Sequence, residues 1–390
     1  MKKNLIYFDI AATTPLSKNV LNNINYIYEQ YWGNVSSTYK YGIACSEKLE
    51  KIRTNIANLF NTMPEDIIFT SGSTESRSIV FNKINEKYSN KNITISSVEH
   101  QATIISANIL RNKGWDINKW AVDNKGLIDP YEFDKYVNKD TKLVSIIWGQ
   151  SEIGTIQPIQ EIGKRCKQKG ILFHVDGTQI ISNGLFNWNK LNCNLMSLSA
   201  HKFGGPKGIG ILLTKKNSRT ILKNEDISFS QEYSIRAGTQ PLALISGTCQ
   251  AIRNIKGNII INDNKITFEN CSTIKLRNYL INKYKKNNKI EITGSISNRL
   301  PNHLSFIVLN KDNNPIEAYK IVNFMSENNI AISSGSACSS HSKKPSNTLK
   351  NMGYDQNKQS CNIRISFSDK NTLEELDIFY KLILKCIEIF

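Results

Sequence analysis

Short apolar runs alternate with amphipathic, helix-length segments through the first half of the chain. This alternation predicts βα units and a largely parallel sheet. Ligands of open α/β sheets bind outside the carboxyl ends of the strands. Five apolar runs end in polar groups, so we expect these ends to converge on one pocket. The five runs cover residues 67–69, 93–95, 143–148, 171–173 and 195–198.

The pattern changes after about residue 215. A loop at 236–241 precedes a long helical region to about 256, and a polar stretch rich in Asn and Lys follows. Mixed helix and strand signals then lead to an amphipathic run at 373–390, and no repeat of solenoid period is present. We therefore expect two domains with a boundary near residue 258. The large α/β domain would comprise residues 16–258, and a smaller α+β domain would comprise residues 1–15 and 259–390.

Two short runs, HVDGTQ at 174–179 and SAHK at 199–202, each follow a strand-like segment. Pyridoxal 5'-phosphate (PLP) needs a lysine to form a Schiff base. It also needs a carboxylate to keep its pyridine nitrogen protonated. Lys202 and Asp176 fit these two roles. Alone, an acid at a strand end is more often a turn former and such a lysine is more often solvated, but together they favour a PLP enzyme.

The composition of the chain argues against several other classes of protein. The chain has 390 residues, 40% of them hydrophobic, which is enough for a sizeable core. The net charge of +17 could mark a nucleic-acid binder, but the lysines are spread along the chain, so we expect no specific nucleic-acid partner. No apolar run of eighteen residues and no secretory segment is evident, so we expect a cytoplasmic protein without a membrane partner. The eight cysteines form no CxxC pair, which favours reduced thiols and no metal site.

These residues together resemble the group I cysteine desulfurases of the NifS/IscS-like kind. That group belongs to the class V aminotransferase family of fold-type I PLP-dependent transferases. The resemblance runs from end to end. Its motifs are YFD at 7–9, AATTP at 11–15, GN at 33–34, SS at 36–37, TSGSTES at 70–76, EH at 99–100, EIG at 152–154, the two runs above, RAGT at 236–239, SSGSAC at 333–338 and IR at 363–364.

Ser73 and Thr74 are expected to open a helix after a glycine turn, where backbone N–H groups can bind the cofactor phosphate. The resemblance implies that Thr74, Ser199 and His201 contact that phosphate. It also implies that Thr239 reaches the phosphate from the other subunit of a homodimer.

The resemblance assigns further roles around the ring and the substrate. It implies that His100 stacks on the pyridine ring and takes part in catalysis, and that Gln179 donates to the ring oxygen. Gln150 stands where an Asn ordinarily contacts the ring oxygen and the substrate. Arg364 would clamp the substrate carboxylate through its planar guanidinium, and Asn34 would lie beside the substrate.

Cys338 distinguishes the desulfurases from other enzymes of this fold. It lies in a Gly/Ser-rich stretch, which suits a thiol that must move. By resemblance its thiolate would attack the sulfur of L-cysteine, release L-alanine and keep the sulfur as a persulfide. The sulfur would pass to acceptor proteins, either an iron–sulfur scaffold or a tRNA thiolation enzyme.

Some positions depart from the family pattern, and they put catalytic efficiency and substrate choice in doubt. Two alternatives stay open, a selenocysteine lyase and a catalytically degenerate basic binding protein. The departures are Val35 and Tyr39 for Pro and His, Arg77 and Ser78 for an acidic or amide residue and Asn, Trp148 for His, and Gln150 and Ser151 for paired Asn residues.

Overall fold

The computed structural model describes residues 5–89, 91–224, 230–262, 265–335 and 345–390. Its largest sheet has seven strands in the order β2-β9-β8-β6-β5-β3-β4. Within the described residues all of them run parallel except β9, so the largely parallel sheet is confirmed. The strands are β2 (Ile67–Thr70), β3 (Asn92–Ser96), β4 (Asp116–Trp120), β5 (Thr141–Ile147), β6 (Leu172–Asp176), β8 (Leu195–Ser199) and β9 (Gly210–Thr214).

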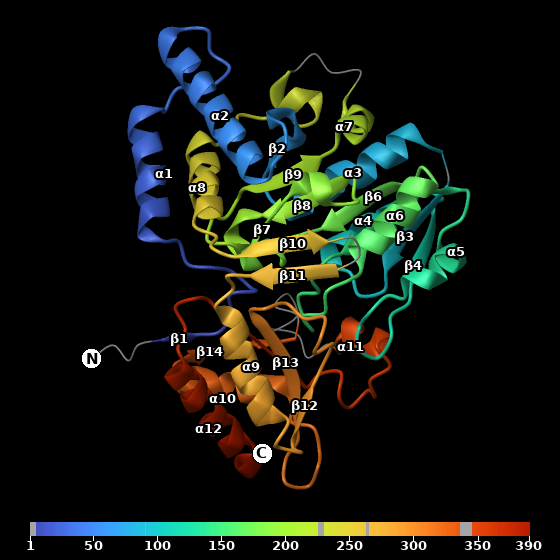
Figure 1. Ribbon diagram of the computed structural model, residues 1–390, viewed down its shortest axis with the longest axis vertical. Helices are drawn as coiled ribbons and strands as arrows, with labels where there is room; N and C mark the ends of the chain where they lie inside the picture. The colour runs from blue at the N-terminus through green and yellow to red at the C-terminus, as the bar shows by residue number, and fades with distance from the viewer. Residues whose placement is uncertain (1–4, 90, 225–229, 263–264, 336–344) are drawn as a thin grey trace.

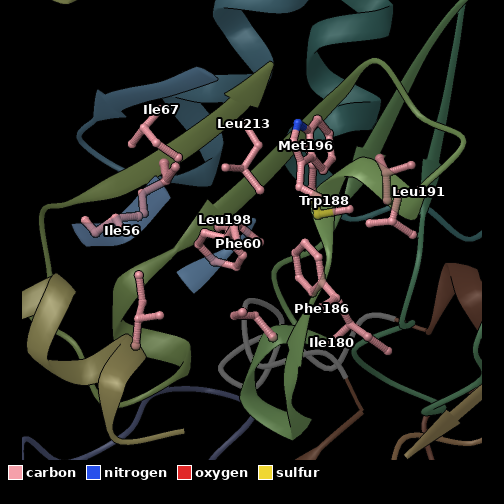
Figure 2. Close-up of a cluster of buried hydrophobic side chains, with 14 of the residues drawn as sticks. Ile56, Phe60, Ile67, Ile180, Phe186, Trp188, Leu191, Met196, Leu198 and Leu213 are labelled. Carbon is pink, nitrogen blue, oxygen red and sulfur yellow. The ribbon is translucent and has the colours of Figure 1, made fainter. Parts of the chain in front are cut away.

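Helices cover both faces of this sheet, which is why its inner strands are buried along their whole length. One face packs against α3 (Ser73–Lys87), α4 (Gln101–Arg111) and α7 (Lys216–Leu222). The other packs against α1 (Lys18–Gln30), α2 (Lys40–Leu59), α5 (Phe133–Tyr136), α6 (Ile159–Gln168) and α8 (Leu242–Arg253). Figure 2 shows part of this second core, where aromatic side chains such as Phe60 and Trp188 pack on Met196 and Leu198.

A second unit lies below the first in Figure 1. Its four-stranded antiparallel sheet has the order β12-β13-β16-β15. The N-terminal strand β1 (Ile6–Tyr7) pairs with β14 (Ile330–Ala331) and so packs with this unit. The other elements are β12 (Ile290–Ile292), β13 (His303–Val308), β15 (Ser333–Ser334), β16 (Asn362–Ser366), α9 (Thr273–Tyr284), α10 (Ala318–Glu327), α11 (Asn347–Asn351) and α12 (Leu373–Ile389).

A hairpin of β10 (Asn258–Asn262) and β11 (Lys265–Glu269) lies between the two units in the chain and pairs with β7 (Leu185–Phe186). Its buried isoleucines, Ile259 and Ile261, belong to the core of the large unit. Because alternate residues of a strand face the same side, both isoleucines point into that core. These contacts attach the hairpin to the core of the large unit, whereas the sequence pattern places the domain boundary near residue 258.

The described helices include none that is both long enough and apolar enough to cross a membrane. The seven cysteines in the described part of the chain all carry free thiols.

Candidate active site

The five polar strand ends named above are linked by contacts at one edge of the large sheet. The Thr178 hydroxyl after β6 donates to the Ser73 hydroxyl after β2, with the oxygens 2.8 Å apart. The Ile147 amide at the end of β5 donates to Glu99 after β3 over 2.6 Å. A Cβ added to Gly72 would lie 3.8 Å from the Ser199 hydroxyl oxygen after β8. The Trp148 amide after β5 donates to the Asp176 carbonyl at the end of β6 over 3.0 Å, which joins the two groups of strand ends into one site.

The N-terminus of α3 provides a cradle for an anion. The helix begins at Ser73, as expected, and has fifteen residues. The backbone N–H groups of its first turn have no acceptor within the helix and point toward its N-terminal end at Gly72. A Cβ on Gly72 would have only the Ser199 hydroxyl within 4 Å, so open space lies in front of the helix. A Cβ on Gly210 would instead come within 2.6 Å of the Gly72 backbone, so glycine there lets β9 approach closely. Thr74 is exposed in the first turn.

Lys202 ends a short 3-10 turn that follows β8. Its Nζ donates to the carbonyl oxygens of Ala11 and Ala12 at 2.8 and 2.7 Å. The Gln179 amide nitrogen donates to the same Ala11 oxygen at 3.0 Å. Two of the proposed cofactor residues thus meet at one backbone segment. Beside them, burial and the charge of Lys202 lower the pKa of His201 to about 4, so its imidazole is neutral at pH 7.

Asp176 ends β6 and is buried, with 2% of its surface exposed. Its Oδ1 accepts from the Thr178 amide at 3.1 Å, and its Oδ2 forms an ion pair with Nη1 of Arg77. Burial is the largest influence on Asp176 and would by itself raise its pKa, but the Arg77 charge and smaller contributions that include the hydrogen bonds from Thr178 together hold this pKa below its ordinary value. The carboxylate is therefore ionised and can bind a pyridinium N–H group.

Two neighbouring groups after β3 are uncharged at neutral pH. Burial, helped by Arg77, lowers the pKa of His100 to about 4, and its Nδ1 accepts from the Ala102 amide at 3.1 Å. A neutral imidazole that accepts at Nδ1 carries its proton on Nε2. Burial also raises the pKa of Glu99 to about 8.

Arg364 on β16 brings the second unit to the site. Its Nη2 pairs with Asp9 at 2.6 Å, and its Nη1 donates to the Ser151 carbonyl at 3.1 Å. Its buried Nε has no partner among the described residues. A guanidinium has five N–H groups, so several stay available for a substrate carboxylate.

Gln150 is used differently from what the resemblance implies. Its amide nitrogen donates to the Val98 carbonyl and the Thr348 hydroxyl, each at 3.2 Å. Its oxygen accepts from the amides of Glu152 and Ile153 at 2.5 and 2.9 Å. Both hydrogens and both lone pairs are thus used within the chain. A contact between Gln150 and the cofactor would require one of these bonds to break.

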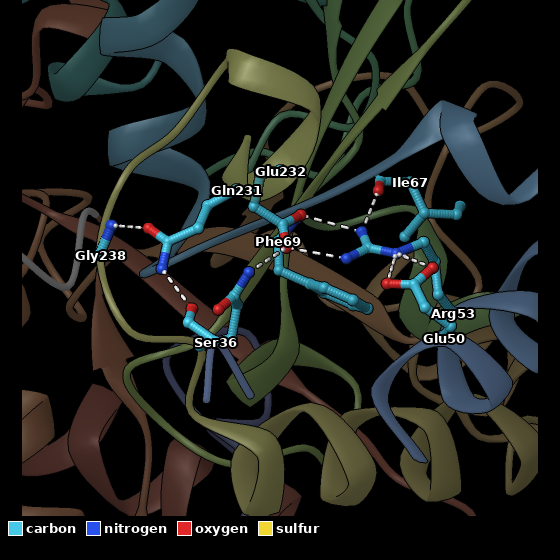
Figure 3. A network of polar contacts seen from close by, with 9 residues as sticks. Ser36, Glu50, Arg53, Ile67, Phe69, Gln231, Glu232 and Gly238 are labelled. Carbon is cyan, nitrogen blue, oxygen red and sulfur yellow. Dashed lines mark hydrogen bonds and ion pairs between the residues drawn. The ribbon is translucent and has the colours of Figure 1, made fainter. Parts of the chain in front are cut away.

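Thr239 is exposed at the end of a loop anchored by the polar network in Figure 3. Gln231 in this loop accepts from the Gly238 amide at 2.8 Å and donates to the Ser36 hydroxyl at 3.3 Å. Asn34 is also exposed, and its Oδ1 caps a turn by accepting from the Ser36 amide at 2.9 Å. The network thus places Asn34 and Thr239 on neighbouring loops of the large unit. Cys338 lies outside the described residues.

Sequence reasoning recognised Arg77 as a departure but did not place it beside Asp176. The signal was present in the spacing of α3. Ser73, Arg77, Val80 and Ile84 fall on one helical face, and all four are buried. An arginine on such a face needs a buried acceptor.

Comparison with known proteins shows the family of this chain. The class-V aminotransferase family model matches residues 6–379, and the chain belongs to that family. Cysteine desulfurase IscS of Buchnera aphidicola subsp. Baizongia pistaciae is 36% identical over 387 residues, covering 98% of this chain and 92% of that protein. Cysteine desulfurase IscS of Dictyoglomus turgidum is 34% identical over 389 residues, covering 99% and 95%.

Solved structures show the same fold. A NifS-like protein superposes with a TM-score of 0.85 at 29% identity, covering 99% of this chain and 100% of that one. SspA in complex with cysteine superposes with a TM-score of 0.79 at 27% identity, covering 93% and 98%. The expected fold class and the resemblance to NifS/IscS-like cysteine desulfurases are confirmed.

Proposed function

We propose that this protein is a PLP-dependent cysteine desulfurase that converts L-cysteine to L-alanine. The sulfur would be transferred as a persulfide on Cys338 to an acceptor protein for iron–sulfur cluster assembly or tRNA thiolation. One observation carries the proposal: the ionised Asp176 ends β6, and Lys202 ends the turn after the neighbouring strand β8, beside the open N-terminus of α3.

The residues present fit PLP. The α3 amides, Thr74, Ser199 and His201 would hold the phosphate in the open space at Gly72. Asp176 would accept from the ring nitrogen, Gln179 would donate to the ring oxygen, and Lys202 would hold the aldehyde carbon covalently. The bound cofactor supplies a sink for the electrons of the substrate α-carbon.

The chain supplies substrate binding and proton control. Arg364 would grip the substrate carboxylate with its unpaired N–H groups, while Asp9 and the Ser151 carbonyl fix the orientation of its guanidinium. His100 presents a neutral ring with a proton on Nε2, which suits it to pack on the cofactor and donate that proton.

Sulfur transfer is assigned to Cys338. Its thiolate attacks the substrate sulfur, so an S–S bond forms while the bond between the substrate Cβ and the sulfur breaks. The electron pair of that bond remains on Cβ, which takes up a proton and becomes the methyl group of alanine. A thiolate of the acceptor protein then attacks the outer sulfur of this persulfide, so the S–S bond breaks, the outer sulfur moves to the acceptor and Cys338 returns to its thiolate.

We further propose a homodimer in the cytoplasm, in which Thr239 reaches the partner's phosphate site. Two observations support these assignments. Thr239 is exposed on an anchored loop, and the described cysteines are free thiols, which suits a reducing compartment.

The test is to incubate the PLP-loaded protein with L-cysteine and measure alanine and sulfide. Borohydride reduction and peptide mapping should place the pyridoxyl group on Lys202. Cys338→Ser should keep the cofactor absorbance and lose sulfide release, whereas the control Cys271→Ser should keep both. Normal sulfide release by Cys338→Ser would contradict the assignment of that cysteine.

The same assay separates the alternatives. A selenocysteine lyase would release selenide from selenocysteine much faster than sulfide from cysteine. A degenerate basic binding protein would show no cofactor absorbance, and its ligand binding would fall steeply with salt.

A further inference from the structure

The ion pair between Arg77 and Asp176 is the least expected contact in the site. Arg77 lies one turn after Ser73 on the buried face of α3, and both partners are only 2% exposed. Water therefore cannot replace either partner. A charge buried to this extent acts strongly on its neighbours, because little solvent screens it.

Arg77 occupies part of the Asp176 carboxylate and leaves part of it open. Nη1 of Arg77 pairs with Oδ2, and the Thr178 amide donates to Oδ1 at 3.1 Å. An ionised carboxylate offers about four acceptor positions, so a further N–H group can bind. A third donor can thus share this carboxylate with the Thr178 amide and with Arg77, which is a permanent cation.

Three other titratable groups around the pair carry little or no charge at pH 7 and so do not change its electrostatics. Burial raises the pKa of Glu99 to about 8, so it is mostly protonated. Burial lowers the pKa of His100 to about 4 and that of His174 to about 3, so both are neutral. Among these groups Asp176 carries the negative charge and Arg77 the positive charge, and the Lys202 amine is a second cation that acts on His100.

We propose that Arg77 is a positioning residue that shares the Asp176 carboxylate with the ring nitrogen of bound PLP and lowers the proton affinity of that nitrogen. This inference rests on the proposed function. A carboxylate already paired with a guanidinium stabilises a pyridinium less, and a buried cation nearby disfavours a second one. A ring nitrogen that is protonated less often withdraws electrons from the α-carbon less strongly.

The test reads the ring nitrogen directly. The protein is loaded with PLP labelled with ¹⁵N at the pyridine position, and its ¹⁵N NMR shift is followed from pH 6 to 9. In the wild type the ring nitrogen should titrate with a pKa about 1–3 units below that in Arg77→Asn, which removes the charge. Arg77→Lys, which keeps a positive charge, should stay close to the wild type.

Each outcome decides one of the two proposals. Failure of PLP to bind would refute the proposed function. Bound PLP whose ring nitrogen remains a pyridinium throughout the wild-type titration would refute the role of Arg77 and leave the function intact. That measurement suffices even if Arg77→Asn does not fold. A merely structural role for Arg77 predicts the same ring-nitrogen titration in all three proteins.

Discussion

Two buried arginine–carboxylate pairs lie within the large unit, and their hydrogen bonding differs. Arg53 on α2 uses all three of its nitrogens, which donate to Glu50, the Ile67 carbonyl and both oxygens of Glu232. Its guanidinium also lies 4.6 Å from the Phe69 ring centroid. Arg77, by contrast, has a buried Nε without a partner among the described residues.

The carboxylates differ in the same way. Glu232 also accepts from the Phe69 backbone amide at 2.8 Å (Figure 3). It accepts in addition from the side-chain amide of Gln240 at 3.3 Å. It holds a stretch in which Glu232, Tyr233 and Ser234 all have positive φ, a conformation that costs about 1–2 kcal/mol per residue. The Arg53–Glu232 pair, whose hydrogen-bonding groups are all used within the chain, thus fixes the backbone. The Arg77–Asp176 pair keeps unused hydrogen-bonding groups that a ligand can bind.

Breaking the Arg53–Glu232 pair should have the largest effect on stability. Arg53→Met leaves the Glu232 carboxylate buried without its cation, which should lower the free energy of unfolding by about 3–5 kcal/mol. Urea denaturation of the purified variant measures this. Lys135→Met breaks an exposed pair with Glu132 and should have a much smaller effect, because solvent screens that pair. Equal effects of the two variants would contradict the comparison.

Arg77→Met should have a smaller effect that depends on the cofactor. Without PLP it should lower the free energy of unfolding by about 1–3 kcal/mol, because Asp176 loses one donor and can take up a proton instead. PLP should then stabilise Arg77→Met more than it stabilises the wild type, since the ring N–H supplies a donor. Thermal unfolding with and without PLP measures the difference. A loss as large as that of Arg53→Met in both forms would mean that both pairs are structural.

Glu99→Gln should show the smallest effect and tests whether Glu99 is neutral. Burial raises the pKa of Glu99 to about 8, whereas the unfolded chain ionises near about 4.3. Between these values the unfolded state has lost a proton that the folded state keeps, so stability falls as pH rises. From pH 6 to 7 the variant should therefore lose about 1.4 kcal/mol less stability than the wild type.

Urea unfolding at both pH values measures this difference, with the exposed Glu132→Gln as control. If the stability of the wild type and of Glu99→Gln changed equally with pH, Glu99 would be ionised in the folded protein and would compete with Asp176 for the positive charge of Arg77.

The parallel sheet and the position of its polar ends could be predicted, because alternating apolar runs and parallel topology dictate both. The pair of Arg77 and Asp176 could not, since 99 positions separate its members and only helix packing brings them together. The hydrogen bonds of the Gln150 side chain could not be predicted either, because its acceptors are a carbonyl after β3 and a hydroxyl on α11. The hairpin of β10 and β11 was missed because its polar positions obscured Ile259 and Ile261.

The contact between Lys202 and the N-terminal segment bears on the order in which the protein folds. Ala11 and Ala12 accept from the lysine across 191 and 190 positions, and the Ala11 amide donates to the Ser366 hydroxyl at 2.8 Å. During synthesis Ala11 leaves the ribosome long before Ser366, which lies 355 positions later in the chain. Contacts of such sequence separation form slowly. The Lys202 amine is therefore fixed in place only after Ser366 has been synthesised, which makes its ordering a late event in folding.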